Sequence, residues 1–219
     1  MTCGDRRRAP HLARRHTFAI APSMTSDNPW TFLATSTAFE NPWLRLEEQH
    51  VIDPVGARQV YGIVRFKKLA VGVLPIADDG MVHLVGQWRV PLGRYSWEMP
   101  EGGCEPGEDP LDCARRELEE EAGVRALRLR PIVKMDLSNS VTDEQAICYL
   151  ATGLSPGVHA PEPVEVLRNR VARFGEVLAD VTAGRITDAM TVAAVLRAHH
   201  MAVTGEIEPA LAKTMLDLE

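Results

Sequence analysis

Short runs that alternate between polar and apolar residues dominate the chain from residue 30 to residue 89, and they predict β-strands. Turn signals separate the runs: Asn41-Pro42 before the first, residues 53–56 before the second, and an Asp-Asp-Gly sequence at 78–80 between the last two. A turn of this kind between two apolar runs is typical of a β-hairpin, so we expect the last two runs to pair. The predicted strands are 43–51, 59–66, 69–76 and 81–89.

One helix is predicted with well-defined ends, over residues 110–122. Asp109 is a favourable N-cap, Pro110 suits the first helical turn, and Gly123 suits the position after the last turn. Strands around a small number of helices predict an α+β sandwich. The remaining predicted elements are strands at 127–135 and 145–152, a Pro/Gly-rich break at 155–163, and helices at 175–182 and 187–199, the last capped by Thr187 or Asp188.

The predicted 110–122 helix presents an acidic stripe beside an apolar one. At about 100° per residue, Glu121 and Glu120 lie on either side of Glu117, and the neighbouring stripe is apolar. Clustered carboxylates repel one another, which predicts a positive group over them. That group is either Arg116 or a divalent cation, because hard cations take oxygen ligands. For an isolated acidic stripe, a solvated helix face is the common alternative.

Charge is distributed unevenly along the chain. Residues 1–26 carry five arginines and a single acid, Asp5, for a charge of +4; the 219-residue chain carries −6, which leaves −10 for residues 27–219. We expect residues 1–26 to be a disordered basic extension, with Met24 as an alternative start. An Arg-rich targeting segment is the other interpretation, although the apolar run of a secretory signal is missing. The negative remainder disfavours nucleic acid and anionic membranes as partners.

Composition narrows the class of protein further. With 45% hydrophobic and 25% charged residues, the chain is long enough to bury a core. Charged residues interrupt every apolar run before it reaches the roughly 20 residues of a membrane-spanning helix. The four cysteines contain no CxxC pair and are too sparse for a disulfide scaffold. We therefore predict a soluble protein of the reducing cytoplasm.

The loop before the helix supplies the most specific pattern. Residues 102–107 contain three glycines, which let the backbone turn tightly and approach a ligand closely. Loop and helix together resemble the Nudix box, a Gly, five residues, Glu, seven residues, and then Arg-Glu-apolar-x-Glu-Glu-x-Gly-apolar. The matching residues are Gly102, Glu108, Arg116, Glu117, Leu118, Glu120, Glu121, Gly123 and Val124.

This resemblance to Nudix hydrolases implies a fold, a reaction and a metal site. It implies an α/β/α sandwich that hydrolyses a nucleoside diphosphate linked to another group, with Mg²⁺ or Mn²⁺ neutralising the diphosphate while water attacks phosphorus. Arg116 and Glu108 would orient the acidic cluster, and Gly102 and Gly103 would let the backbone approach the substrate. The implied metal ligands are the carboxylates of Glu117, Glu120 and Glu121 and the backbone carbonyl of Glu101.

The similarity extends upstream of the box. Residues 87–103 resemble the approach to the box in the ADP-ribose pyrophosphatase and nucleotide-sugar hydrolase branch. The resemblance implies that Arg89 helps to hold the diphosphate and that Glu98 lies near the metals or the substrate. A surface ion pair is the alternative for Arg89. We expect Trp97 to pack in the core rather than to stack on a base.

Downstream, residues 138–144 resemble the loop that carries a catalytic Glu outside the box in this branch. This places the general base, or the residue that orients the water, at Glu144, with Glu120 as a second candidate and Asp143 as a neighbour able to substitute. Asn139-Ser140 stand where many ADP-ribose pyrophosphatases have Pro-Gly. ADP-ribose, GDP-mannose, another nucleotide sugar and a different dinucleotide therefore stay open as substrates.

The resemblance also implies a domain organisation. An N-terminal antiparallel β subdomain at 27–66 precedes a Nudix catalytic domain at 67–200, and a C-terminal tail at 201–219 has no interpretation. Relatives in this branch are commonly homodimers in which the N-terminal subdomain packs on the partner. Trp30 and Trp43 have the apolar surface for such an interface, unless they pack on their own chain.

The leading prediction is a Mg²⁺-dependent nucleotide-sugar pyrophosphatase that forms a nucleoside monophosphate and a sugar phosphate. One alternative is a regulatory domain that senses a nucleotide without turnover, although such domains usually lose box carboxylates and this chain keeps them. Another is hydrolysis of nucleoside triphosphates or dinucleoside polyphosphates. Decapping of mRNA is disfavoured because the negative charge would repel RNA.

Overall fold

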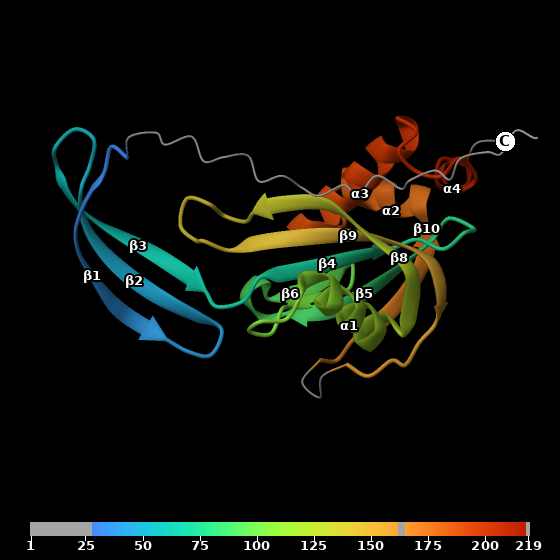
Figure 1. The fold of residues 1–219 in the computed structure, drawn as a ribbon, viewed down its shortest axis with the longest axis horizontal. Coiled ribbons are helices and arrows are strands. Elements are labelled where there is room, and N and C mark those ends of the chain that lie inside the picture. Colours follow the sequence, from blue (N-terminus) through green and yellow to red (C-terminus); the bar gives the residue numbers. More distant parts are fainter. Residues whose placement is uncertain (1–27, 162–164, 218–219) are drawn as a thin grey trace, which may run out of the picture.

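The computed structural model describes residues 28–161 and 165–217, which form three β-sheets and four α-helices (Figure 1). The predicted basic extension at residues 1–26 lies outside this part of the chain. The first sheet is antiparallel, with the order β1-β2-β3, and it projects to one side of the remaining structure (Figure 1). Its strands are β1 (Thr31–Glu40), β2 (Leu44–Ile52) and β3 (Arg58–Phe66).

The central sheet has the order β7-β4-β9-β8, in which β4 and β9 run parallel and the other pairs run antiparallel. A third sheet, with the order β10-β5-β6, is antiparallel. A short 3-10 helix, Val90–Leu92, connects β5 to β6. The strands are β4 (Ala70–Pro75), β5 (Met81–Arg89), β6 (Arg94–Glu98), β7 (Glu101–Gly103), β8 (Val124–Asp136), β9 (Gln145–Pro156) and β10 (Arg168–Arg173).

Helices cover both faces of the central sheet. Successive residues of a strand point to opposite faces, and on β9 Tyr149 packs with α1 (Pro110–Ala122) whereas Cys148 belongs to the core that contains α3 (Ala189–Val203). The core between α1 and the sheet is the smaller one and includes Cys113 and Leu118 of α1. The second is larger and also contains α2 (Phe174–Thr182). The layered arrangement confirms the predicted α+β sandwich.

The predicted hairpin between residues 69–76 and 81–89 forms only at its turn. Ala77 N–H donates to the Met81 carbonyl at 2.8 Å, Gly80 has a left-handed φ of 79°, and a single bridge joins Ile76 to Val82. Beyond it the two strands enter different sheets. Both edges of β4 are occupied, one by β7 and the other by β9, so β5 has no edge of β4 left to pair with.

The C-terminal part differs from its prediction in two places. The predicted helices appear as α2 and α3, and Asp188 caps α3 by accepting from Thr191 N–H at 2.7 Å. The edge strand β10 was not predicted, because it has a single buried residue and therefore shows no apolar alternation. The segment expected to be a tail contains α4 (Pro209–Met215), whose Leu211 and Met215 are buried in the larger core.

Candidate active site

The Nudix-box helix begins and ends where its punctuation predicts. The Asp109 carboxylate accepts from Leu111 N–H at 2.8 Å, and Gly123 has a left-handed φ of 66° at the C-terminus. Leu118 packs into the smaller core, which fixes the rotation of the helix. This rotation buries the carboxylate-bearing side chains of Glu117 and Glu121 at the edge of the sheet. The predicted placement of an acidic stripe beside an apolar one is confirmed.

Arg116 is the positive group that lies over the acidic stripe. Its guanidinium makes a bidentate ion pair with Glu108, with both N···O distances at 3.0 Å. It also donates to Glu117 at 2.7 Å and to Glu120 at 3.1 Å. Hydrogen bonds from Arg116 and from the Glu105 backbone lower the pKa of Glu108 to about 2. Arg116 therefore orders the cluster, although Glu121 receives no hydrogen bond from it in the described structure.

Glu121 is the most deeply buried acid of the box, with 1% of its surface exposed. One carboxylate oxygen accepts from Glu101 N–H at 2.8 Å, and the other has no hydrogen-bond partner among the described residues. Burial raises the pKa of Glu121 to about 8, and the nearby charges of Glu117 and Glu165 add to the shift. Burial also raises the pKa of Glu117. These are the properties of acids whose charge a cation would stabilise.

A side chain at position 102 would displace the Glu117 carboxylate. A Cβ atom on Gly102 would lie 2.2 Å from Glu117 Oε1, far inside any ordinary contact. At Gly103 the nearest atom would be the flexible Lys68 side chain at 2.8 Å, and the Gly103 carbonyl accepts from Arg116 at 3.4 Å. Both glycines border the cavity described below. Their absent side chains make room for the acidic cluster as well as for a ligand.

Arg89 and Glu98, predicted from outside the box, meet at the wall of the site. Arg89 Nε lies 3.0 Å from both carboxylate oxygens of Glu98, and Arg89 Nη2 lies 2.8 Å from Glu101 Oε1. Burial opposes the charge of Arg89, but the ion pairs outweigh it and raise its pKa. Glu98 is 2% exposed and the Arg89 side chain is 34% exposed, so the pair is half-buried and is not the surface pair considered above. Trp97 packs against the larger core, as predicted.

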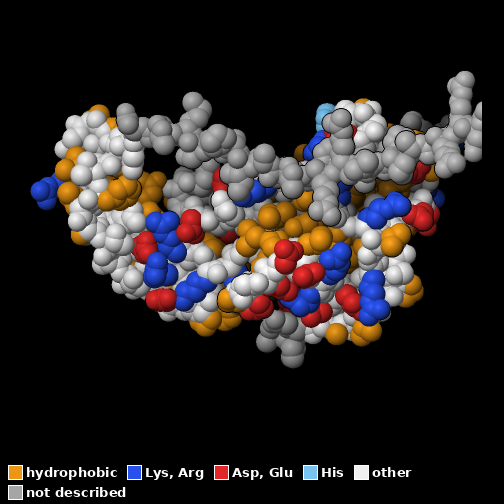
Figure 2. All heavy atoms as spheres, viewed as in Figure 1, with side chains coloured by type: hydrophobic (Ala, Val, Ile, Leu, Met, Phe, Trp, Pro, Cys, Tyr) orange, Lys and Arg blue, Asp and Glu red, His pale blue; other side chains and the backbone are white. Residues whose placement is uncertain are grey.

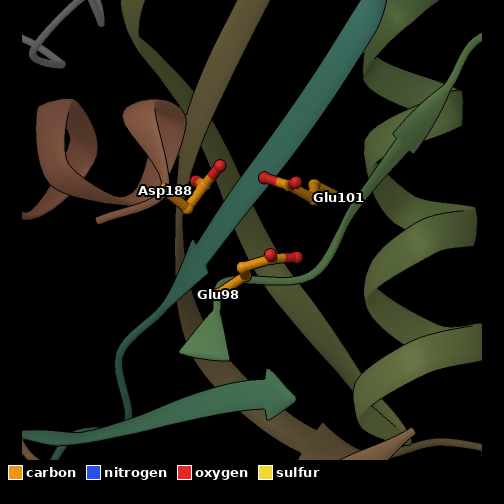
Figure 3. A group of neighbouring side chains, drawn as sticks. All are labelled: Glu98, Glu101 and Asp188. Atoms are coloured by element: carbon orange, nitrogen blue, oxygen red, sulfur yellow. The ribbon is translucent and has the colours of Figure 1, made fainter. Parts of the chain in front are cut away.

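The side chains of Glu101 and Asp188 join this group, which sequence reasoning missed. Figure 3 shows the carboxylates of Glu98, Glu101 and Asp188 converging, and an oxygen of each lies within 4.8 Å of the others. Burial, followed by the charges of Asp188 and Glu98, raises the pKa of Glu101 well above its ordinary value. Asp188 was predicted only as a helix cap. Its proximity depends on how α3 packs on the sheet, which no local pattern encodes.

A cavity of about 420 Å³ is bordered by Arg89 and Glu101, whereas Glu98, Glu121 and Asp188 do not line it. It contains the box residues Glu117 and Glu120 together with Glu144 and Glu165 from distant parts of the chain. Sequence reasoning missed Glu165, because it lies in an irregular Pro-rich segment and its only signal is its acidity. The other lining residues are Trp43, Phe66, Lys68, Ala70, Gln87, Arg89, Glu101, Gly102, Gly103, Glu105, Arg116 and Met190.

Of the two neighbouring acids at 143 and 144, only Glu144 borders the cavity. Burial and the adjacent charge of Asp143 raise the pKa of Glu144. The carboxylate of Asp143 instead accepts from Phe66 N–H at 2.9 Å and pairs with Arg65 at 3.3 Å. The structure therefore does not support Asp143 as a substitute for Glu144, because its carboxylate is bound to β3.

The residues around the cavity fit a divalent cation. The donors are carboxylate oxygens, which hard cations prefer, and one buried oxygen of Glu121 has no partner in the described structure. Glu117, Glu120 and Glu121, the Glu101 carbonyl and Glu165 are the groups within this region able to hold it. The resulting arrangement combines an acidic wall with the half-buried guanidinium of Arg89.

Residues 66–190 match the NUDIX domain, and the chain belongs to the Nudix family, whose hydrolases generally use divalent metal ions. An ADP-ribose pyrophosphatase of Mycobacterium tuberculosis is 33% identical over 153 residues, covering 64% of this chain and 69% of the relative. An ADP-sugar pyrophosphatase of Mus musculus is 33% identical over 155 residues, covering 64% and 70%.

Two further relatives extend the comparison. A methanol dehydrogenase activator of Bacillus methanolicus is 32% identical over 168 residues, covering 74% of this chain and 89% of the relative. The crystal structure of an ADP compounds hydrolase superposes with a TM-score of 0.74 at 23% identity, covering 83% of this chain and 99% of that structure. This likeness confirms the predicted fold. Among the described helices, none is long and apolar enough to cross a membrane.

Proposed function

We propose that the protein hydrolyses the diphosphate bond of a nucleotide sugar, using Mg²⁺ or in its place Mn²⁺, and forms a nucleoside monophosphate and a sugar phosphate. The observation that carries the proposal is that the box carboxylates of Glu117 and Glu120 and the guanidinium of Arg89 border one cavity, with the Glu121 carboxylate buried close to Glu117. The relatives named for ADP-ribose and ADP-sugars support this substrate class. GDP-mannose is a second possible substrate, because Asn139-Ser140 stand where many ADP-ribose pyrophosphatases have Pro-Gly.

Each part of the proposed reaction is assigned to particular residues of the chain. A bound divalent ion would neutralise the diphosphate and lower the pKa of water, held by Glu117, Glu120 and Glu121 with the Glu101 carbonyl. Glu144 takes the proton of the attacking water, since its raised pKa brings its basicity closer to neutral pH. Arg116 keeps the box carboxylates in place. Arg89 faces the cavity and binds phosphate oxygens.

Glu120 and Glu165 are the alternative acceptors for the proton of the attacking water. Both border the cavity, as Glu144 does. Glu120 also accepts from Arg116 at 3.1 Å, so its carboxylate is already engaged by the box. The charge of Glu165 acts on Glu117 and Glu121, which places it close to the proposed metal ligands and favours a role beside them.

An apolar wall of the cavity provides a place for the nucleobase. Trp43 is 65% exposed although it borders the cavity, and Phe66 lies on the same cavity. A flat base stacks well on an indole ring, because both faces are apolar and polarisable. We assign Trp43 to the base, and the acidic wall and Arg89 to the diphosphate.

The proposal includes a homodimer formed through the N-terminal sheet. Every residue of β1 is exposed, including Phe32, and Val60 of β3 is 59% exposed. A hollow of about 520 Å³ on this sheet is bordered by Trp30 and Tyr61 among others. Figure 2 shows hydrophobic side chains on the projecting lobe formed by this sheet. A second copy of the chain covers such a surface without a further component.

The described cysteines, Cys104, Cys113 and Cys148, are free and buried, which supports the cytoplasmic location that the proposal includes. A regulatory role without turnover is the second candidate. The Bacillus methanolicus activator gives it support by its name. The complete set of box carboxylates argues for turnover instead.

Chromatographic product analysis tests the proposed function. The full chain is incubated with Mg²⁺ and, separately, with ADP-ribose, GDP-mannose, other nucleotide sugars, diadenosine polyphosphates and nucleoside triphosphates. Cleavage of a nucleotide sugar to the two monophosphates is expected, and Glu121→Gln should remove most of it. Binding of a nucleotide sugar without cleavage would replace the proposal with the regulatory role, and cleavage confined to triphosphates would refute the substrate class.

A further inference from the structure

The turn between β8 and β9 continues the N-terminal sheet. In the order β1-β2-β3, the outer edge of β3 would be left without a strand partner. Val64 N–H on that edge donates to the Val141 carbonyl at 2.9 Å, and Asp143 N–H donates to the Val64 carbonyl at 3.3 Å. A parallel bridge also joins Val64 to Thr142. The turn therefore belongs to two sheets at once, and Figure 1 shows it facing the projecting lobe.

Side chains strengthen this contact at both ends of the turn. The Asp143 carboxylate accepts from Phe66 N–H through Oδ1 and pairs with Arg65 through Oδ2, at 2.9 and 3.3 Å. At the other end, the Tyr61 hydroxyl donates to the Ser140 carbonyl at 2.6 Å. Three groups of β3 thus hold a turn that lies about eighty residues away in the sequence.

Arg65 is itself held from behind. Its Nε donates to Glu47 on β2 at 3.0 Å, and Glu47 is buried and also pairs with Arg45 at 2.6 Å. An arginine fixed on one side by a buried acid presents the rest of its guanidinium in a defined direction. The Arg65–Asp143 pair is therefore part of a network that runs from β2 through β3 to the turn.

The next residue along the turn is Glu144, which borders the catalytic cavity. Leu137 N–H donates to the Glu144 carbonyl at 2.9 Å and closes the base of the turn. Asp143 and Glu144 are adjacent along the backbone, so the contacts that hold Asp143 on β3 also restrict where Glu144 can lie, and of the two only Glu144 borders the cavity. Ser138 has a φ of 32°, an unfavourable backbone conformation for a non-glycine residue that its surroundings must maintain.

We propose that Asp143 and Arg65 are positioning residues that hold Glu144 at the cavity, so that the N-terminal sheet takes part in catalysis within its own chain. The inference rests on the proposed function in one respect, the role of Glu144 in turnover. It goes beyond the dimer interface assigned to this sheet above. The substrate meets neither residue, because neither borders the cavity.

Steady-state kinetics of the full chain with Mg²⁺ and ADP-ribose, or the nucleotide sugar it cleaves, test the inference. Asp143→Ala removes both contacts of the carboxylate and should lower kcat about 10- to 100-fold, because a small misplacement of a catalytic group has an effect of that size. KM should change less than about twofold, since substrate binding is not altered. Asp143→Asn keeps an acceptor for Phe66 N–H and should restore part of the activity.

Asp136→Ala is the matched control. Asp136 lies at the end of β8, on the same β8–β9 hairpin, and its carboxylate accepts from the Gln145 side chain at 2.9 Å. Within the described residues, the Asp136 carboxylate is hydrogen-bonded on its own hairpin and not to the N-terminal sheet. Its replacement therefore removes a hydrogen-bonded aspartate without releasing the turn, and wild-type kcat and KM are expected. A loss equal to that of Asp143→Ala would overturn the inference.

A double-mutant cycle tests whether the two residues act as a pair. If Arg65→Gln and Asp143→Asn disrupt the same contact, the double variant should lose little more activity than the worse single variant. If the double variant instead loses activity by the product of the two single losses, the residues act independently, and the proposed pairing of Arg65 with Asp143 would be overturned. An increase in KM with kcat unchanged would move Asp143 to substrate binding and would also overturn it.

Hydrogen exchange separates this inference from the proposed function. In the wild-type chain, Val64 and Asp143 N–H should be protected, and Asp143→Ala should raise exchange across residues 137–144 whether or not the protein has turnover. A wild-type protein that cleaves no nucleotide sugar would refute the proposed function and the role of Glu144, while the exchange still reports on the contact. Faster exchange with unchanged kcat, or unchanged exchange, would overturn the inference itself.

Discussion

Replacing Gly102 by alanine tests the acidic cluster without removing any of its charges. The added methyl group would lie 2.2 Å from Glu117 Oε1 and 2.3 Å from its Cδ, whereas ordinary contacts begin at 3.4 Å. The Glu117 carboxylate must therefore move by about 1 Å. Gly102 has no left-handed φ, so alanine introduces no backbone strain there. The perturbation is confined to the position of one proposed metal ligand.

The expected consequence is a large loss of activity with a small loss of stability. A displacement of about 1 Å at a catalytic group typically lowers the rate about 100-fold, which corresponds to about 2.7 kcal/mol of transition-state stabilisation. The free energy of unfolding should fall by only about 1 kcal/mol, because the end of the Glu117 side chain can rotate away from the methyl group. Catalysis and folding are therefore expected to separate.

The assay is kcat as a function of Mg²⁺ concentration, together with thermal unfolding. For Gly102→Ala we expect lower kcat and a higher Mg²⁺ concentration at half-maximal activity. Gly62→Ala is the control, because a Cβ atom at Gly62 meets nothing within 4 Å and its φ is also ordinary. Wild-type kcat and Mg²⁺ dependence in Gly102→Ala would refute the placement of Glu117 as a ligand. If the melting temperature falls as much as it does when a cavity is created in a protein core, the loss of activity would result from destabilisation of the fold and not from displacement of Glu117.

Three further predictions concern single residues of the site. Because the pKa of Glu121 is raised to about 8 in the folded protein, the metal-free protein should lose stability as the pH rises from about 4.5 to 8; Mg²⁺ or Glu121→Gln should flatten that dependence, and a flat wild-type curve from thermal unfolding would contradict it. Trp43→Ala should raise KM for the nucleotide sugar about tenfold with little change in kcat, whereas Trp88→Ala, an exposed tryptophan outside the cavity, should leave both unchanged. Glu144→Gln should lower kcat at least about 100-fold and remove the acidic limb of the pH profile, and a retained limb would transfer the base to Glu120 or Glu165.

The box could be predicted because everything that defines it is local. Asp109, Pro110 and Gly123 set the ends of α1, and the spacing of Glu117 and Glu121 then determines their shared face. Nothing outside residues 102–124 is needed to reach this result. The same locality accounts for the capped start of α3 at Asp188.

What could not be predicted depends on contacts between distant segments. The Asp-Asp-Gly sequence at 78–80 indicates a turn between two strands. The two strands nevertheless enter different sheets, because β7 and β9 occupy both edges of β4. Glu165 and the carboxylate of Asp188 reach the site through tertiary packing and have no spacing relation to the box. The strand β10 has too few buried residues to show a pattern.

The adjacent acids Asp143 and Glu144 show where this limit affects function. From the sequence, either could serve as the base, because no local pattern says which of the two carboxylates faces the cavity. The hydrogen bonds of Asp143 to Phe66 N–H and Arg65 on β3 settle its direction, and Glu144 borders the cavity. The N-terminal sheet therefore does what the box cannot do alone: it distinguishes two chemically similar carboxylates and presents one of them to the site.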